Sequence, residues 1–277
     1  MLNPLAVAEV VRRALEEDLG SGDLTSSLLF GPADRGRGEI LARQEGVVAG
    51  LAVAEVAFRL LASECRFEPL VAEGDRVKPG EVIARVEGPL LALLGAERVA
   101  LNFLGRMSGI ATLTARYVDR VRPYKARICD TRKTAPGLRL VDKYAVVVGG
   151  GTNHRFTLGE AVLIKDNHLK AAGGIAQAVA RVRQRLPVTA KVEVEVESLA
   201  QVEEALAAGA DLIMLDNFSP LDLRRAVERI AGRALTEASG GITLETVAEV
   251  AAAGVDYISV GALTHSVSSL DLSLELL

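Results

Sequence analysis

The chain has 277 residues, of which 49% are hydrophobic and 25% charged, so it can bury a sizeable core and is too apolar to be disordered. Its net charge of −4 and its aromatic content of 4% argue against a nucleic-acid partner. Two cysteines, Cys65 and Cys129, are too few for a disulfide framework or a four-cysteine zinc site. Charges begin at Glu9 and no apolar run reaches about 18 residues, so neither a secretory signal nor a membrane span is expected. We therefore expect a cytoplasmic protein.

The first part of the chain mixes helical and β-rich patterns. Apolar periodicity predicts helices over 5–15 and 51–63, and GEILARQEGVVAG (38–50) predicts strands. The run GSGDLTS (20–26) between them is expected to be a loop. A further helix, over 91–111, links this part to the rest of the chain.

The segment 70–89 predicts two short strands around a turn-rich centre. It resembles the hairpin of biotinyl and lipoyl carrier domains, in which a lysine at an exposed turn is modified, commonly next to a methionine. Here the single lysine, Lys78, precedes a proline and has no neighbouring methionine. A structural β-module is therefore favoured over a carrier.

From residue 126 onward, apolar strands alternate regularly with amphipathic helices. The β-rich runs are 126–130, 161–166, 192–197, 212–217, 234–241 and 257–262, and the helical runs between them are 175–186, 199–208, 221–230 and 244–253. Such alternation predicts parallel strands connected by return helices, as in a β/α barrel. With six or seven strands instead of eight, an open, incomplete barrel is favoured.

Cationic side chains gather at the ends of these strands. Arg132 and Lys133 follow the first strand, Arg155 follows a triple glycine, and Lys165 ends the second strand. A local positive excess in an acidic protein indicates a small anionic ligand, because guanidinium and ammonium groups recognise carboxylates and phosphates. From charge alone, a solvated basic face remains the alternative.

Carboxylates occupy the next two strands. Glu193, Glu195 and Glu197 share one face of a strand, and Asp216 ends the strand that follows. Inward carboxylates are costly unless they meet cations. They could hold Mg²⁺ that keeps several waters, or they could form salt bridges to the barrel lysines.

Two glycine-containing turns near the C-terminus, Ser239–Gly241 and Gly261–Ala262, each follow a strand. The last loops of β/α barrels commonly bind a phosphate through backbone N–H groups, although short glycine turns are also ordinary connections. The three histidines, His154, His168 and His265, lack the spacing of a zinc site. Nucleotide-binding P-loop and hydrolase-elbow motifs are missing.

Several distinctive blocks, in order along the whole chain, resemble the quinolinate phosphoribosyltransferase family. They are EEDLGSGDLTS, ERVALNFLGRMSGIAT, DTRKTAPGLR, GGGTNHRFTLGEAVLIKDNH, VEVEVES, IMLDNF, EASGGI and VDYISVGALTHS. Ala135 departs from the family pattern, in which many relatives carry a second threonine, but no charged site residue is lost. The resemblance implies an α/β fold, with an N-terminal α/β sandwich-like domain (1–110) and an open parallel β/α barrel (111–265). The tail 266–277 is expected to return to the first domain.

The resemblance also implies an activity. The 5-phosphoribosyl group of 5-phosphoribosyl-1-pyrophosphate would pass to quinolinate with decarboxylation, giving nicotinate mononucleotide, pyrophosphate and CO₂ in de novo NAD biosynthesis. Mg²⁺ would be the cofactor. The protein would be a homodimer, or a larger assembly of dimers, with Arg98 donated across the interface. Without the resemblance, a helix salt bridge of Arg98 with Glu97 or another local acid would be the simpler expectation.

The family pattern assigns roles to residues of this chain. The substrate-binding residues would be Arg98, Thr131, Arg132, Lys133, His154, Arg155 and Lys165. The catalytic residues would be Lys133, Lys165, Glu195 and Asp216, with Glu195 and Asp216 also binding the metal. The 5-phosphate would lie against Ser239, Gly240, Gly241, Val260, Gly261 and Ala262. Within the same fold, the alternative is a related phosphoribosyltransferase acting on another pyridine or on a molybdenum-associated ligand.

Overall fold

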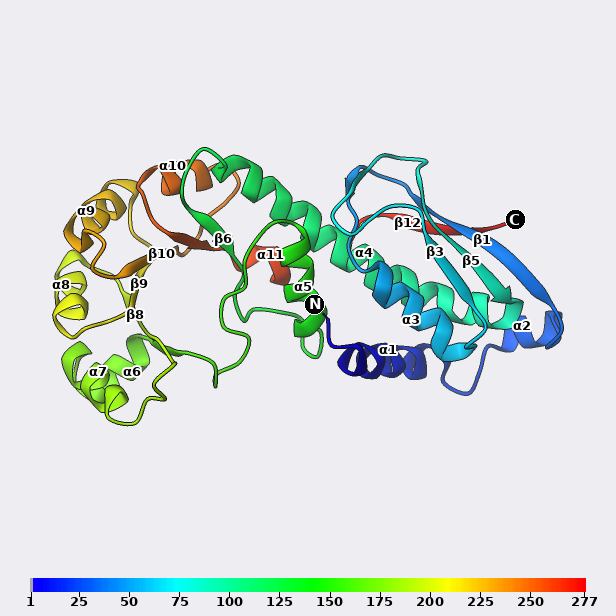
Figure 1. Cartoon of the computed structure of the whole chain (residues 1–277), viewed down its shortest axis with the longest axis horizontal. Coiled ribbons are helices and arrows are strands. Elements are labelled where there is room, and N and C mark those ends of the chain that lie inside the picture. The colour runs from blue at the N-terminus through cyan, green and yellow to red at the C-terminus, as the bar shows by residue number, and fades with distance from the viewer. Residues whose placement is uncertain (1) are drawn as a thin grey trace. The chain divides into compact units, whose positions relative to one another are not determined.

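The computed structural model describes residues 2–277 and separates into two compact units (Figure 1). The first unit comprises residues 2–115, 134–150 and 262–277, and the second comprises 116–133 and 151–261. Among the described residues, no helix combines the length and the hydropathy that a membrane span requires.

The first unit contains a four-stranded antiparallel sheet in the order β12-β1-β5-β3, whose outer strand β12 lies near the C-terminus. Its strands are β1 (Arg35–Ala42), β3 (Arg66–Pro69), β5 (Val82–Pro89) and β12 (Leu272–Leu276). A separate pair joins β2 (Gly46–Val47) to β4 (Arg76–Val77). The helices that begin in this unit are α1 (Pro4–Leu19), α2 (Leu24–Leu29), α3 (Leu51–Leu61), α4 (Leu90–Val121), α5 (Arg139–Val148) and α11 (Ala262–His265).

Local capping explains where the first two helices begin. The side chain of Asn3 accepts the N–H of Leu5, and α1 then buries a stripe of apolar residues four apart. Helix α2 begins at Leu24, where the carboxylate of Asp23 accepts the N–H of Ser26. The prediction of a loop over 20–26 is therefore wrong from Leu24 onward, because Asp23 is an effective N-cap.

The expected hairpin of segment 70–89 does not form. Its two strands belong to different sheets, because β4 pairs with β2 whereas β5 pairs with β1 and β3. Lys78 lies on the exposed connection between them, where its N–H donates to the carboxylate of Glu81 at 3.0 Å. The resemblance to a carrier hairpin thus stops at the sequence pattern.

The second unit is built on a six-stranded parallel sheet in the order β6-β11-β10-β9-β8-β7. Its strands are β6 (Arg127–Cys129), β7 (Val162–Ile164), β8 (Val192–Val196), β9 (Leu212–Asp216), β10 (Leu235–Ser239) and β11 (Tyr257–Ser259). Helices cover its outer side (Figure 1), namely α6 (Asp166–Ala172), α7 (Ile175–Arg183), α8 (Leu199–Ala207), α9 (Pro220–Ile230) and α10 (Val247–Ala252). Because β6 and β7 are the two ends of the sheet, the predicted open barrel is confirmed, and of the six or seven strands expected it has six.

Strand β8 shows how the sequence separates the two faces of this sheet. Val192, Val194 and Val196 alternate with glutamates and are fully buried. In a strand, successive side chains point to opposite faces, so Glu193 and Glu195 share the opposite face. The carboxylates therefore line the inner face of the open barrel.

The division of the chain differs from the expected boundaries at 110 and 265. Residues 134–150, which include α5, belong to the first unit, and α4 continues to Val121. A two-point ion pair holds α5 there, because Nε and Nη2 of Arg106 each donate to the fully buried carboxylate of Asp142 at 2.8 Å. Such two-point pairs fix geometry as well as charge.

Candidate active site

Four neighbouring strands bring chemically active residues to their carboxyl ends. Lys165 follows β7, Glu195 lies on β8, Asp216 ends β9 and Ser239 ends β10. These strands are adjacent in the sheet, and Asp216 pairs in register with Ser239. Glu195, Asp216 and Ser239 follow Lys165 by 30 to 74 positions in the sequence, yet all four residues lie at one edge of the sheet. Parallel barrels carry their active sites at this edge.

The ammonium group of Lys165 forms an ion pair with the carboxylate of Glu195. The carboxylate of Asp216 accepts a hydrogen bond from the side-chain amide of Asn217 at 2.8 Å. Of the three glutamates expected to share a face, Glu197 lies beyond the end of β8 and is exposed. The salt bridge expected as an alternative to metal binding is thus present at Glu195. The carboxylates at this edge of the sheet are those of Glu195 and Asp216.

The turn after β10 needs its glycines. Gly240 has a φ of 96°, and a Cβ there would lie 2.2 Å from Oδ1 of Asn217. Gly241 has a φ of 59° but faces open space. A cavity of about 180 Å³ is lined by this turn together with Phe218 and Thr246. The turn thus leaves its backbone accessible beside a small cavity, as a phosphate-binding loop requires.

Hydrogen bonds to Asp130 hold the loop that carries His154 and Arg155. The buried carboxylate of Asp130 accepts the N–H of His154 at 2.9 Å and also binds the side-chain amide of Asn153. The guanidinium of Arg155 donates to the carbonyl oxygen of Ala161 at 2.8 Å. Burial, and secondarily the charge of Arg132, lowers the pKa of Arg155. Two guanidinium groups close enough to repel each other favour a ligand with more than one negative charge.

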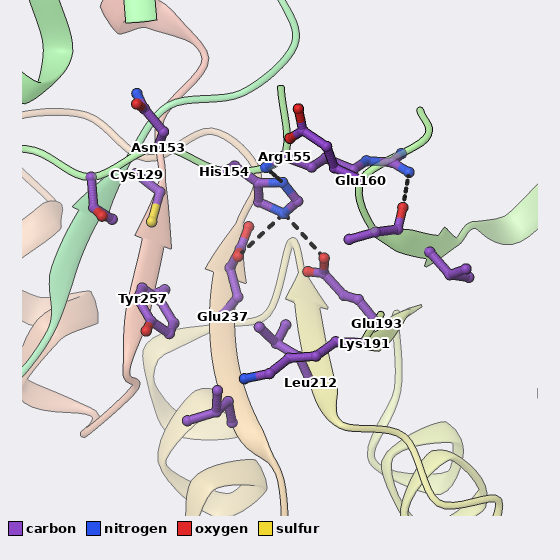
Figure 2. A pocket seen from close by; sticks show the side chains of 14 residues that line it. Cys129, Asn153, His154, Arg155, Glu160, Lys191, Glu193, Leu212, Glu237 and Tyr257 are labelled. Atoms are coloured by element: carbon purple, nitrogen blue, oxygen red, sulfur yellow. Dashed lines mark hydrogen bonds and ion pairs between the residues drawn. The ribbon is translucent and has the colours of Figure 1, made fainter. Parts of the chain in front are cut away.

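His154 also faces the interior of the barrel, towards two glutamates (Figure 2). Its Nε2 lies 3.0 Å from Oε2 of Glu193 on β8 and 3.6 Å from Oε2 of Glu237 on β10. Its Nδ1 accepts the backbone N–H of Arg155 at 2.7 Å. Burial, followed by the charge of Glu193, raises the pKa of Glu237 to about 7. A cavity of about 360 Å³ adjoins this group and extends towards the amino-terminal ends of the strands, where Leu212, Leu235 and Tyr257 line it.

The other residues expected at the site are more exposed. The hydroxyl of Thr131 accepts the N–H of Lys133 at 3.0 Å, and the Lys133 side chain is exposed. Arg98 is exposed on α4 in the first unit, whereas Thr131 to Lys133 belong to the second. Within residues 2–277, Arg98 forms no ion pair with Glu97, so the local explanation for this arginine is not supported. Val260 and Gly261 follow β11, and Ala262 begins α11.

Comparisons with known proteins identify the family. Residues 110–275 match the family model of the quinolinate phosphoribosyl transferase C-terminal domain, and residues 23–108 match that of the N-terminal domain. The chain belongs to the quinolinate phosphoribosyltransferase family. This confirms the family and fold expected from the sequence blocks.

Family relatives cover almost the whole chain. A probable nicotinate-nucleotide pyrophosphorylase (carboxylating) of Bacillus subtilis is 46% identical over 99% of this chain and 94% of its own length. Its counterpart from Mycobacterium leprae is 45% identical over 98% of this chain and 97% of its own length. The nicotinate-nucleotide pyrophosphorylase structure from Francisella tularensis superimposes with a TM-score of 0.95 at 39% identity, covering 100% and 98% of the two chains.

Sequence reasoning missed one residue of this family member's barrel interior and gave another no specific role. Glu237 was not singled out, although it lies two positions before Ser239 and so shares its face of β10. Glu193 was grouped with Glu195 and Glu197 and was not expected to contact His154. Of the other histidines, His168 caps α6, because its Nδ1 accepts the N–H of Lys165 at 2.9 Å. His265 lies beside the hydroxyl of Ser266.

Proposed function

We propose that this chain transfers the 5-phosphoribosyl group of 5-phosphoribosyl-1-pyrophosphate to quinolinate with loss of CO₂, a step of de novo NAD biosynthesis. Its family membership supports this reaction, and almost the whole length of the chain matches the relatives that carry the name. The observation that supports the proposal most strongly is that one unit contains both the Arg132 and Arg155 guanidiniums and the Lys165–Glu195 ion pair. Cations suited to a dicarboxylate then lie in the same unit as carboxylates suited to a metal-bound pyrophosphate.

Binding comes first. Quinolinate is a dianion with two carboxylates on adjacent ring carbons, so it needs cations arranged around a flat ring. Arg132 and Arg155 offer planar forks that match carboxylates, whereas Lys165 offers a movable charge. His154 would present its imidazole edge to the same substrate.

Bond exchange follows at the ribose. The pyridine nitrogen forms a bond to C1 of the ribose as the bond from C1 to the pyrophosphate oxygen breaks, and the sugar passes through an oxocarbenium-like state. Lys165, and Lys133 where its exposed side chain can reach, would stabilise the negative charge that accumulates on the leaving group. The alkylated ring nitrogen is then cationic.

Decarboxylation follows from that charge. The bond between C2 and its carboxylate carbon breaks and releases CO₂, and its electron pair stays on C2 beside the cationic nitrogen. A proton then binds C2 and gives nicotinate mononucleotide. Because the negative charge leaves a well-hydrated carboxylate and comes to lie on C2 directly beside the cationic nitrogen, a partly dry pocket favours the step.

Mg²⁺ belongs to the same proposal. Glu195 and Asp216 supply hard carboxylate oxygens from neighbouring strands, and two such ligands suit an ion that keeps several waters and bridges to phosphates. The ion would neutralise the pyrophosphate leaving group. Glu195 would exchange its contact with Lys165 for the metal or share the two.

The assembly is proposed to be a homodimer. Arg98 lies on the exposed face of a long helix and forms no ion pair with its neighbour Glu97. It could therefore serve the substrate carboxylates of a second copy.

A substrate panel tests the function. We expect turnover of quinolinate with the ribosyl donor and Mg²⁺, and no measurable turnover of nicotinate, which lacks the second carboxylate needed by the arginine pair. Efficient turnover of nicotinate or of another pyridine in place of quinolinate would favour the related phosphoribosyltransferase instead.

A further inference from the structure

We infer that Glu193 and Glu237 are positioning residues that hold the Nε2–H of His154, and through it the His154–Arg155 segment, in the orientation that the dicarboxylate substrate requires. This inference rests on the proposed function. It concerns two buried residues behind the substrate-binding groups, not groups that touch the substrate.

The hydrogen bonds define the state of the imidazole. A backbone N–H can only donate, so Nδ1 of His154, which accepts the N–H of Arg155 at 2.7 Å, carries no proton. The ring proton of the neutral imidazole is therefore on Nε2, which points at Oε2 of Glu193 at 3.0 Å and lies 3.6 Å from Oε2 of Glu237 (Figure 2). Glu193 is placed to accept that proton in a hydrogen bond, and the carboxyl group of Glu237 adds an electrostatic contact on the same nitrogen, so the two residues fix the ring.

Burying these two glutamates costs the fold free energy. Their side chains are 7% and 2% exposed, and Oε1 of each is buried without a hydrogen-bond partner among the described residues. Apolar residues of similar size usually serve a core better than an incompletely satisfied charge. Two costly carboxylates around one imidazole therefore indicate a requirement on that imidazole.

The segment they hold is short and directly attached to the site. Asp130 fixes the backbone of His154 from one side, and the two glutamates fix its ring from the other. Because Nδ1 in turn receives the N–H of Arg155, a rotated imidazole would release that backbone group as well. A change at Glu193 should then reach Arg155 through His154.

A bound metal ion is the competing explanation. The ligand atoms of His154, Glu193 and Glu237 lie within 4.8 Å of one another, as they would around an ion. An ion on Nε2 would, however, leave both ring nitrogens without a proton, since Nδ1 already accepts from Arg155. The geometry thus favours a hydrogen-bonded imidazole over a ligand.

Nuclear magnetic resonance tests the tautomer without any substrate. The chain has three histidines, so the nitrogen signals of His154 can be assigned by their loss in His154→Gln. We expect the Nε2–H tautomer in the unmodified protein. An Nδ1–H tautomer, or a stoichiometric metal ion retained by the purified protein at these three residues, would overturn the inference.

Kinetics test the coupling. Glu193→Leu should raise the KM for quinolinate by roughly tenfold, with kcat and the KM for the ribosyl donor much less affected. Glu193→Gln, which keeps an oxygen acceptor, should restore most of the loss. In a His154→Ala background, Glu193→Leu should add nothing, because its effect acts through His154.

Thr236→Val is the matched control. Thr236 is a buried neighbour of Glu237 whose hydroxyl bonds to Asp256 at 2.8 Å on the opposite face of β10, so its loss destabilises the strand without touching His154. Its KM for quinolinate should be unchanged. Equal losses in this control, or additive effects of the His154 and Glu193 changes, would overturn the inference. If the parent protein itself does not turn over quinolinate, the proposed function fails, while the tautomer remains measurable.

Discussion

The guanidinium of Arg155 makes contacts that a lysine cannot reproduce. One of its nitrogens binds the carbonyl oxygen of Ala161, and its charge faces that of Arg132. The planar fork can hold this carbonyl and still offer other N–H groups to a carboxylate. An ammonium group at the end of a flexible chain would have to choose one of them.

Arg155→Lys is therefore expected to lower kcat/KM for quinolinate by about 30- to 150-fold, which corresponds to about 2–3 kcal/mol for a lost charge-assisted contact. Arg181→Lys, on an exposed face of α7, is the control and should leave the kinetics unchanged. Steady-state rates that remain equal for the two variants would contradict the assignment of Arg155.

Glu237 gives a pH-dependent stability. Burial raises the pKa of its carboxyl from 4.5 to about 7, so the folded protein holds this proton more tightly than the unfolded chain. The contribution is present below pH 4.5 and is lost as the pH rises through 7, by up to about 3 kcal/mol. Glu237→Gln mimics the protonated form, so at pH 8 it should be more stable than the parent and its stability should vary less between pH 5 and 8. Chemical denaturation at several pH values measures this, and parallel curves for the two proteins would refute it.

At the scale of elements, the strands of the open barrel were predictable and the partners of the N-terminal strands were not. Short apolar runs separated by amphipathic helices allow only parallel pairing with return helices, so the six strands follow from the local pattern. The segment 70–89 has a hairpin pattern, yet β4 and β5 pair with strands distant in sequence. Which strand completes a sheet is decided by tertiary packing, and the local pattern carries no record of it.

The turn after β10 gives a test at this scale. At Gly240, a side chain would collide with Asn217, whereas at Gly241 it would enter open space. Gly240→Ala should therefore abolish binding of the ribosyl donor, while Gly241→Ala should cost only about 1 kcal/mol, the usual penalty of a left-handed backbone. Calorimetric titration with the ribosyl donor separates the two, and equal affinities for both variants would contradict a phosphate-binding role for this turn.

At the scale of the whole molecule, the site combines predictable and unpredictable parts. Lys165, Glu195, Asp216 and Ser239 could be placed together from the sequence, because each lies at or next to the carboxyl end of a strand of one parallel sheet. The contact of His154 with two interior glutamates could not, because it depends on how a loop folds back across β8 and β10. Strand periodicity reveals which face Glu237 shares but not what approaches that face.

The proposed dimer is tested by mixing two inactive chains. Arg98→Ala and Lys165→Ala should each be nearly inactive alone. If Arg98 serves the partner's site, half of randomly mixed dimers contain one intact site of two, so about a quarter of the parent activity should return. No recovery in verified mixed dimers would show that Arg98 acts in its own chain or not at all.

The central claim is that the cations and carboxylates of this barrel carry out ribosyl transfer and decarboxylation on one substrate. It is tested most directly with quinolinate labelled with carbon-13 in the carboxylate next to the ring nitrogen, incubated with the ribosyl donor and Mg²⁺. We expect labelled CO₂, pyrophosphate and unlabelled nicotinate mononucleotide in equal amounts. A nucleotide that keeps the label, or no pyrophosphate release from quinolinate, would contradict the account.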